Sequence, residues 1–447
     1  MLGVLSHRTY RHLFFAQVIA LLGTGTATVA LGLLAYDLAG AEAGGVLGTA
    51  LAIKMVAYVG VAPVVGAFAN RLPRRAFLVA MDLLRAAVAL SLPFVTQIWQ
   101  IYALIFVLQC CSAAFTPTFQ ATIPDVLPKE KDYTRALSLS RMAYDMESLV
   151  SPMIAAALLT VISFHWLFAF TSLGFLISAL LVLSVVLPLS EAKERTGTVY
   201  EKTFRGMSIY LRTPRLRGML ALNLAAAAAS SMVIVNTVVY VQTRLGRESG
   251  DVPLALACFG FGSMVVALLL PICLDRMSDR RPMLLGAIIM TSGLAMGAAV
   301  GTFGQATEWP FFLLTLFVIG VGYSMTQTPS GRLLRRSATA DDRPAVFAAQ
   351  FSLSHLCWLV TYPLAGQIGI AVGLPAAFGV LAVVALLGML SAWALWPAND
   401  VEELVHSHGD DDASLVHLET GEPHGAGRHK HAYAIDELHL RWPTSGN

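Results

Sequence analysis

Long apolar runs separated by short polar connections dominate this chain. Each run has about 20 residues or more, which is the length a helix needs to cross the hydrocarbon core of a bilayer. The runs are continuous, whereas the strands of a membrane barrel alternate polar and apolar residues over about ten positions. The pattern therefore predicts an all-α membrane protein with about twelve spanning helices. They cover residues 13–37, 45–69, 76–97, 99–122, 137–162, 166–188, 217–242, 252–274, 282–303, 309–328, 345–370 and 373–396.

The composition agrees with a membrane protein and excludes several other classes. Hydrophobic residues make up 56% of the 447 residues and charged residues only 13%, against about 25% charged residues in soluble proteins. The five cysteines show no CxxC spacing, so neither a disulfide framework nor a zinc cluster is expected. No nucleotide-binding glycine motif and no HExxH occurs, so we expect no enzyme, no cofactor and no nucleic-acid partner.

Lysine and arginine gather in alternate connections, which predicts the orientation. Basic residues in short loops mark the cytoplasmic side, so we expect both termini in the cytoplasm of a bacterial cell, with the chain in its inner membrane. The longest basic connection, 191–216, is expected to be a linker loop between two six-helix bundles, 1–190 and 217–397. Residues 398–447 carry most of the histidines and are expected to be a largely disordered cytoplasmic tail.

Two motifs occur twice, about 205–212 residues apart, as expected of a transporter built from two related halves. One runs from Gly66 to Arg75 and returns from Asp275 to Arg281. The other is Thr116-Pro117, which returns as Thr328-Pro329.

The first motif resembles the loop signature Gly-x-x-x-Asp-Arg-x-Gly-Arg-Arg of the major facilitator superfamily (MFS), and the resemblance covers residues 8–397. The first copy has Gly66, Arg71, Arg74 and Arg75, with Asn70 in place of the aspartate. The second copy has Asp275, Arg276, Arg280 and Arg281. The resemblance implies a gating latch at these loops. The alternative is that the arginines only set topology. Asp82 and Arg85, three residues apart, are expected to pair with each other beside this loop.

A narrower resemblance concerns the stretches that begin at Gln17 and Thr49, together with the histidine-bearing tail. They are similar to nickel-resistance exporters of the NreB type, which implies export of nickel or cobalt. Motifs of proton-driven drug exporters are altered, with Phe106 at an arginine position and Glu147 at a glycine position, although Gln109 remains. These departures argue against an ordinary drug antiporter.

Ionisable residues within spans cost about 2.5–3.5 kcal/mol each on insertion scales and are functional candidates. Lys54 lies well inside the second span, and Asp145 and Glu147 lie inside the fifth. Arg141 precedes Asp145 by four residues and can neutralise it on the same helix face. Glu147 has no such local partner and is the better candidate proton carrier, with Gln109 and Lys54 as further lining of a central cavity.

Candidate metal ligands occur in the spans and in the tail. His355 and Cys357 lie in the eleventh span and Cys110 in the fourth, and imidazole and thiolate suit nickel or cobalt. The alternatives are a packed histidine bonded to a carbonyl and cysteines that act as small apolar residues. The tail candidates are His406, His408, His429 and His431, unless the tail is simply solvated.

The sequence thus predicts a monomeric secondary transporter in a lipid bilayer, driven by protons, that exports a divalent metal ion. Export of an organic solute, either a drug or a siderophore-like metabolite, is the alternative. A membrane sensor that binds its ligand without moving it is a second alternative.

Overall fold

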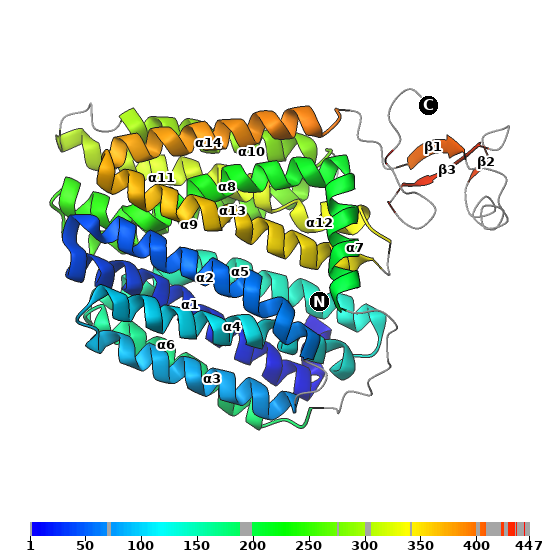
Figure 1. Ribbon diagram of the computed structural model, residues 1–447, viewed down its shortest axis with the longest axis horizontal. Coiled ribbons are helices and arrows are strands. Elements are labelled where there is room, and N and C mark those ends of the chain that lie inside the picture. The colour runs from blue at the N-terminus through cyan, green and yellow to red at the C-terminus, as the bar shows by residue number, and fades with distance from the viewer. Residues whose placement is uncertain are drawn as a thin grey trace.

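The computed structural model describes residues 2–68, 73–187, 199–274, 277–299, 305–339, 342–398, 403–407, 422–423, 428–433, 435 and 442. Long helices form two groups that lie side by side (Figure 1). The first group contains α1 (Arg8–Ala39), α2 (Ala43–Phe68), α3 (Arg74–Ser91), α4 (Ile98–Val126), α5 (Glu130–Leu159) and α6 (His165–Leu183). The second contains α8 (Pro214–Val239), α9 (Asp251–Leu274), α10 (Arg280–Ala299), α11 (Gln305–Gln327), α12 (Ser330–Arg336), α13 (Arg343–Ala371) and α14 (Leu374–Leu395). Short helical turns are η1 (Leu2–Ser6), η2 (Gly40–Glu42), η3 (Leu92–Phe94) and η4 (Tyr240–Arg244).

The long helices fit the hydropathy pattern closely, because a backbone in lipid must satisfy its own hydrogen bonds within the helix. Ten stretches of the described chain are long and apolar enough to cross a membrane, and one of them joins α1 to most of α2. The all-α membrane fold is confirmed, and the long helices are consistent with twelve spans. Helix ends follow local chemistry. For example, α4 begins with a capping box made by Gln97 and Gln100.

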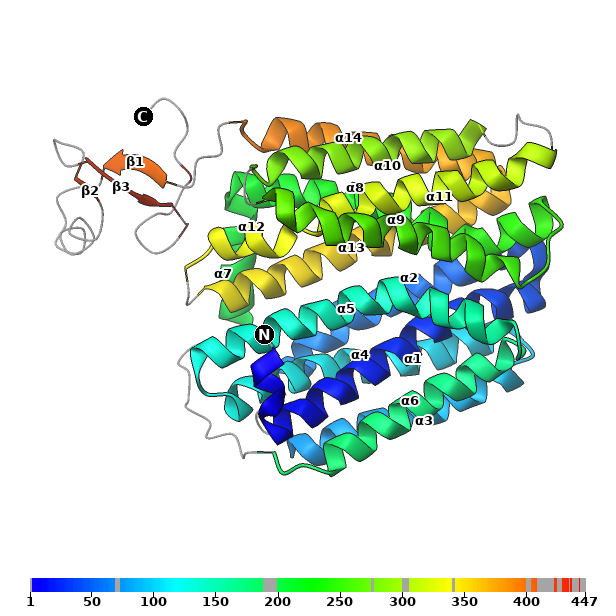
Figure 2. The ribbon, with the colours of Figure 1, turned by 180° about the vertical axis from the view of Figure 1, so that it is seen from behind.

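The linker differs from the expected loop, because it contains the helix α7 (Val199–Arg212). This helix stands across the ends of both groups, on the side of the molecule that also carries the N-terminus (Figures 1 and 2). We call this side the terminal side. Arg205 of α7 donates to Asp342, at the start of α13, over 2.8 Å. Tyr210 donates to Gln350 of α13, and burial raises the pKa of Tyr210, which keeps the hydroxyl protonated.

The opposite ends of the two groups pack tightly together. A Cβ added at Gly48 of α2 would lie 2.6 Å from the carbonyl oxygen of Tyr362 on α13. A Cβ added at Gly366 of α13 would lie similarly close to the carbonyl oxygen of Gly44 on α2. Nearby, Thr243 donates to the hydroxyl of Tyr36 over 3.0 Å, which links η4 to α1. Opening the protein on this side therefore requires α2 and α13 to separate.

Part of the tail is regular, which corrects the expectation of a largely disordered segment for the residues concerned. Strands β1 (Glu403–Ser407), β2 (Glu422–Pro423) and β3 (Arg428–Ala432) form an antiparallel sheet in the order β1-β3-β2. The sheet lies beyond the terminal side of the helices (Figure 1). In this register His406 stands opposite His429, and Leu404 stands opposite His431.

Candidate functional site

A narrow pocket lies inside the first group of helices, between α1, α2, α4 and α6. Among the described residues that line it, Lys54 is the one charged side chain. The free space holds about one or two water molecules and is far too small for a drug-sized solute. Its lining includes Thr24, Thr28, Lys54, Gln109, Ser112 and Phe175. The pocket is thus a small crevice with a mixed polar and apolar lining around a single cation.

The polar lining residues are held by their own helices. Thr24 and Thr28 donate to carbonyl oxygens one turn back on α1, over 2.9 and 3.1 Å. Ser112 does the same on α4 over 3.0 Å. The Gln109 side chain is buried, and its Oε1 atom has no hydrogen-bond partner in the described part of the chain. A buried amide oxygen without a partner is costly, so this position suits a water molecule or a ligand.

Glu147 faces this region from α5 and acts electrostatically on Lys54. Gly25 on α1 makes room for α5, because a Cβ there would lie 3.3 Å from Cγ of Glu147 and would collide with Ser151. Neither Lys54 nor Glu147 forms a salt bridge or a side-chain hydrogen bond with another residue that the structure describes, and both keep some accessible surface. The two groups of opposite charge therefore lie near each other without direct contact, and only Lys54 lines the crevice.

Aromatic rings connect this crevice to the second group of helices. The ring of Tyr58 on α2 stacks on the ring of His355 on α13, with centroids 5.4 Å apart and planes 13° apart. The ring centroids of Phe351 and His355 lie 4.0 Å apart. The ammonium nitrogen of Lys54 lies 5.9 Å from the centroid of the Tyr58 ring. Lys54 also acts electrostatically on His355. The structure thus brings Lys54, Glu147 and His355 to the junction of the two halves.

Two of the three candidate metal ligands in the spans, His355 and Cys357, are engaged within their own helix. His355 contacts the carbonyl oxygen of Phe351 through Nδ1 at 2.6 Å, and Cys357 donates to Leu353 over 3.6 Å. Cys110 is a free, half-buried thiol on α4. Across the side chains that the structure describes, no group of three or more His, Cys, Asp or Glu residues is arranged to hold a metal ion.

Several predicted site residues are described only in part or not at all. The backbone of Arg141, Asp145, His406, His429 and His431 is described, but their side chains are not. Asn70, Arg71, Asp275, Arg276 and His408 lie outside the described residues altogether. Gly66 belongs to the terminal-side end of α2.

On the terminal side of the first half, ion pairs hold α3 in place. Arg74 pairs with Asp125 at the end of α4, and Arg75 donates to the carbonyl oxygen of Leu183. Asp82 and Arg85 form the expected pair, which is buried. Ser178 of α6 donates to Asp82 over 2.7 Å. The pair therefore binds α3 to α6.

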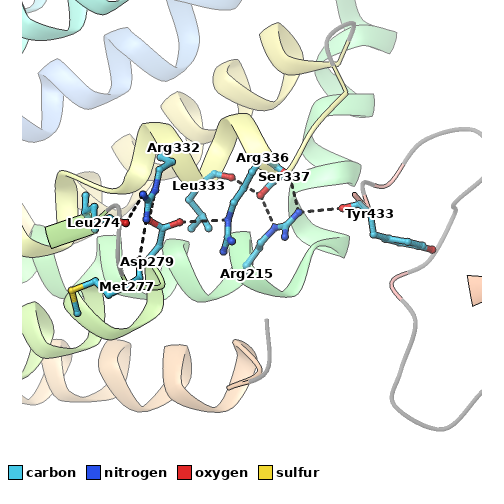
Figure 3. Close-up of polar contacts among 9 residues, drawn as sticks. All are labelled: Arg215, Leu274, Met277, Asp279, Arg332, Leu333, Arg336, Ser337 and Tyr433. Atoms are coloured by element: carbon cyan, nitrogen blue, oxygen red, sulfur yellow. Dashed lines mark hydrogen bonds and ion pairs between the residues drawn. The ribbon is translucent and has the colours of Figure 1, made fainter. Parts of the chain in front are cut away.

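The second half carries a related cluster, centred on Asp279 (Figure 3). This carboxylate is 1% exposed and accepts from Nε of Arg332 over 2.8 Å, while Nε of Arg336 lies 3.4 Å away. Arg332 also donates to the carbonyl oxygen of Leu274 over 2.8 Å. Arg280 donates to the carbonyl oxygen of Trp396 over 2.9 Å, and Arg281 is exposed.

The sequence did not predict the pair of Asp279 and Arg332, nor its relation to the pair of Arg74 and Asp125 in the first half. Asp279 follows Arg74 by 205 positions, and Arg332 follows Asp125 by 207, which matches the spacing of the duplicated motifs. In the first half the pair joins the start of α3 to the end of α4, and in the second half it joins the start of α10 to α12, the short helix that follows α11. The repeat therefore keeps the ion pair and reverses its charges, so a search for conserved motif letters could not find it.

Arg215, at the terminal-side end of α8, connects this cluster to the tail (Figure 3). The fully buried guanidinium donates to Ser337 over 2.8 Å, to the carbonyl oxygen of Arg336 over 2.9 Å and to that of Tyr433 over 3.2 Å. The ring of Trp442 lies 4.9 Å from the guanidinium carbon. A short tail segment therefore docks on the second half.

Removing the Trp442 ring is expected to weaken this docking. In the Trp442→Ala variant the loss of the cation–π contact should lower stability by about 0.5–2 kcal/mol, visible as a lower Tm of the purified protein. Trp442→Phe keeps a ring over Arg215 and is expected to lose less. A Tm that is equal in all three proteins would show that the tail contact contributes no stability.

Comparison with known proteins agrees with this architecture. A family model described as Major Facilitator Superfamily matches residues 13–248 and 219–421. The uncharacterized MFS-type transporter YvqJ of Bacillus subtilis is 24% identical over 404 residues, which cover 86% of this chain and 92% of that protein. Macrolide efflux protein A of Enterococcus faecalis is 26% identical over 152 residues, 32% of this chain and 47% of that protein. Neither of these relatives is described as a nickel or cobalt exporter.

Solved structures share the fold at low identity. A D-xylose-proton symporter superposes with a TM-score of 0.65 at 14% identity and covers 88% of this chain and 99% of its own. A bacterial homolog of the human lysosomal transporter Spinster gives 0.67 at 12% identity, with 88% and 99% covered.

Proposed function

The chain belongs to the Major Facilitator Superfamily, and on this premise we propose that it exports an organic solute by proton-coupled alternating access. It is a multi-pass membrane transporter and not an enzyme. The observation that carries the finer proposal is the meeting of Lys54, Glu147 and His355 at the junction of the two halves. Charged groups at this depth face a wet cavity or a partner, and sites at the interface of repeats bind solute in this class of fold.

Glu147 is the proposed proton carrier. A carboxylate can gain and lose a proton, and each change alters its attraction for Lys54 on the neighbouring helix. Because α5 packs on α9 of the other half and α2 packs on α13, a change at this pair acts on helices that must separate when the site opens. Proton binding and helix movement are thereby linked at one place.

The direction of transport and the organic cargo are also parts of the proposal. Two observations support them: the partial similarity to proteins named macrolide efflux protein A, and a crevice lined by aliphatic, aromatic, hydroxyl and amide groups around one ammonium. Basic loops place the termini in the cytoplasm of a bacterial cell under this proposal, with a monomer as the working unit.

Export of nickel or cobalt is the second candidate. The tail supports it, since His406 and His429 stand opposite each other across two strands. The spanning helices support it less, because their described side chains include no group of ligands for a metal ion.

Transport into inside-out membrane vesicles that contain the protein tests these alternatives. The panel contains a macrolide, a lipophilic dye, nickel and cobalt, each measured with and without an imposed pH gradient. We expect accumulation of an organic probe that depends on the gradient. Gradient-dependent accumulation of metal alone would favour the second candidate, and a version lacking residues 398–447 would then show whether the tail takes part. Binding without accumulation of any probe would favour a sensor.

A further inference from the structure

We propose that Lys54 is the recognition site for an anionic group of the transported solute, so that the substrate class is an amphipathic organic anion such as an aromatic carboxylate. This inference rests on the proposed function and names the substrate class of the same site. The charge of the crevice is the first observation that supports it. Lys54 is the one charged residue among the described lining residues, and no carboxylate belongs to that lining.

The ammonium group of Lys54 is available to a ligand. It has three donors, and no described residue forms a hydrogen bond or salt bridge with it. Glu147 acts on it only at longer range. A cation in a site of low dielectric constant attracts an anion more strongly than it would in water. An anionic solute that enters the crevice therefore meets an ammonium whose donors are free.

The neighbouring groups suit the rest of such a solute. Gln109 has a buried amide whose Oε1 has no partner among the described residues, and the amide can be turned to present its NH₂ group to an anion. The rings of Tyr58, His355 and Phe351 form a cluster beside Lys54, in which Tyr58 and His355 are stacked and Phe351 is tilted against both. Offset stacking on such rings favours a planar, apolar body. The ammonium and the amide thus suit an anion, and the neighbouring rings suit an aromatic group once the helices around the crevice move apart.

Glu147 then competes with the solute for the same cation. While Glu147 is charged, it offsets part of the Lys54 charge and repels an incoming anion. The charge on Glu147 therefore lowers the affinity of the site for an anion, and the solute must compete with this carboxylate for the field of Lys54.

Three forms of one aromatic dye test the proposal: a carboxylate, its neutral methyl ester and an amine analogue that is cationic. Each is measured by accumulation in inside-out vesicles and by its effect on the Tm of the purified full chain. We expect the wild type to prefer the carboxylate over the ester by about tenfold or more, which equals about 1.4 kcal/mol. Lys54→Met is expected to lose this preference, and Lys54→Arg to keep part of it. Lys129→Met removes an exposed lysine at the start of α5 and serves as the matched control.

The double variant Lys54→Met with Glu147→Gln separates recognition from a purely structural ion pair. The readouts for this variant are counterflow and the Tm shift, which do not need Glu147 as a proton carrier. If the lysine only neutralises Glu147, removing both charges restores the carboxylate preference in both readouts, and the proposal is wrong. If the lysine binds the solute, the carboxylate preference stays lost. Preference for the ester or the amine in the wild type would overturn the anion site and leave the exporter in place. A carboxylate that raises the Tm more than the ester does, without accumulating, would support the anion site and contradict the exporter.

Discussion

Glutamine in place of Glu147 is expected to abolish accumulation of solute driven by a pH gradient. Glutamine keeps the size of the side chain and its hydrogen-bonding ability but does not exchange a proton. Accumulation should fall to the level of passive equilibration, because a side chain that exchanges no proton cannot couple the solute to the proton gradient. Counterflow, in which labelled solute exchanges with unlabelled solute without a gradient, is expected to continue. Both rates are measured in the same vesicles.

Glu42→Gln is the matched control for this experiment. Glu42 is exposed in η2, on the side of the molecule opposite the terminal side. This variant should transport like the wild type. A Glu147→Gln protein that still accumulates solute against its gradient would remove Glu147 from the coupling mechanism. A Glu147→Gln protein that loses counterflow as well, while keeping the wild-type elution profile, would assign Glu147 to solute binding and not to proton transfer.

The second large effect is expected at Asp279. In Asp279→Asn the two guanidinium groups of Arg332 and Arg336 lose the buried carboxylate between them. Breaking a buried ion pair costs about 3–5 kcal/mol. Arg332 remains 41% exposed, so water compensates part of the loss and we expect about 2–3 kcal/mol. The Tm of the purified protein and its urea unfolding midpoint measure this change.

The duplicated architecture supplies both a control and a rescue. Asp125→Asn breaks the related pair in the first half, where the carboxylate is 37% exposed, so its effect should be smaller. Exchanging the charges in the second half, by Asp279→Arg with Arg332→Asp, copies the arrangement of Arg74 and Asp125. This double variant should be more stable than either single variant. An equal loss of stability in the two single variants and the double variant would mean that the pairing itself does not stabilise the fold.

The sequence alone predicted most helices within a few residues, and the reason is local. A spanning segment satisfies its backbone hydrogen bonds within itself, so the hydropathy of about 20 consecutive residues is enough to locate it. The pair of Asp82 and Arg85 was equally accessible, because positions three apart share a helix face. The individual ionisable residues Lys54, Glu147 and His355 could be selected for the same kind of reason, since a charge in lipid is costly wherever it lies.

The tertiary structure decided which of these groups meet and what they meet. Helix α7 was hidden in a basic connection, because its stability comes from contacts such as Arg205 with Asp342 and not from a long apolar run. Asp279 gains its partners only when α12 folds over the start of α10, and the reversed charges of the repeat conceal the relation. Tyr58 and His355 are almost 300 residues apart, and only the packing of α2 on α13 places their rings together. A sequence fixes which residues can enter lipid because that is a local free-energy balance, whereas the partner of a buried charge depends on helices that are distant in the chain.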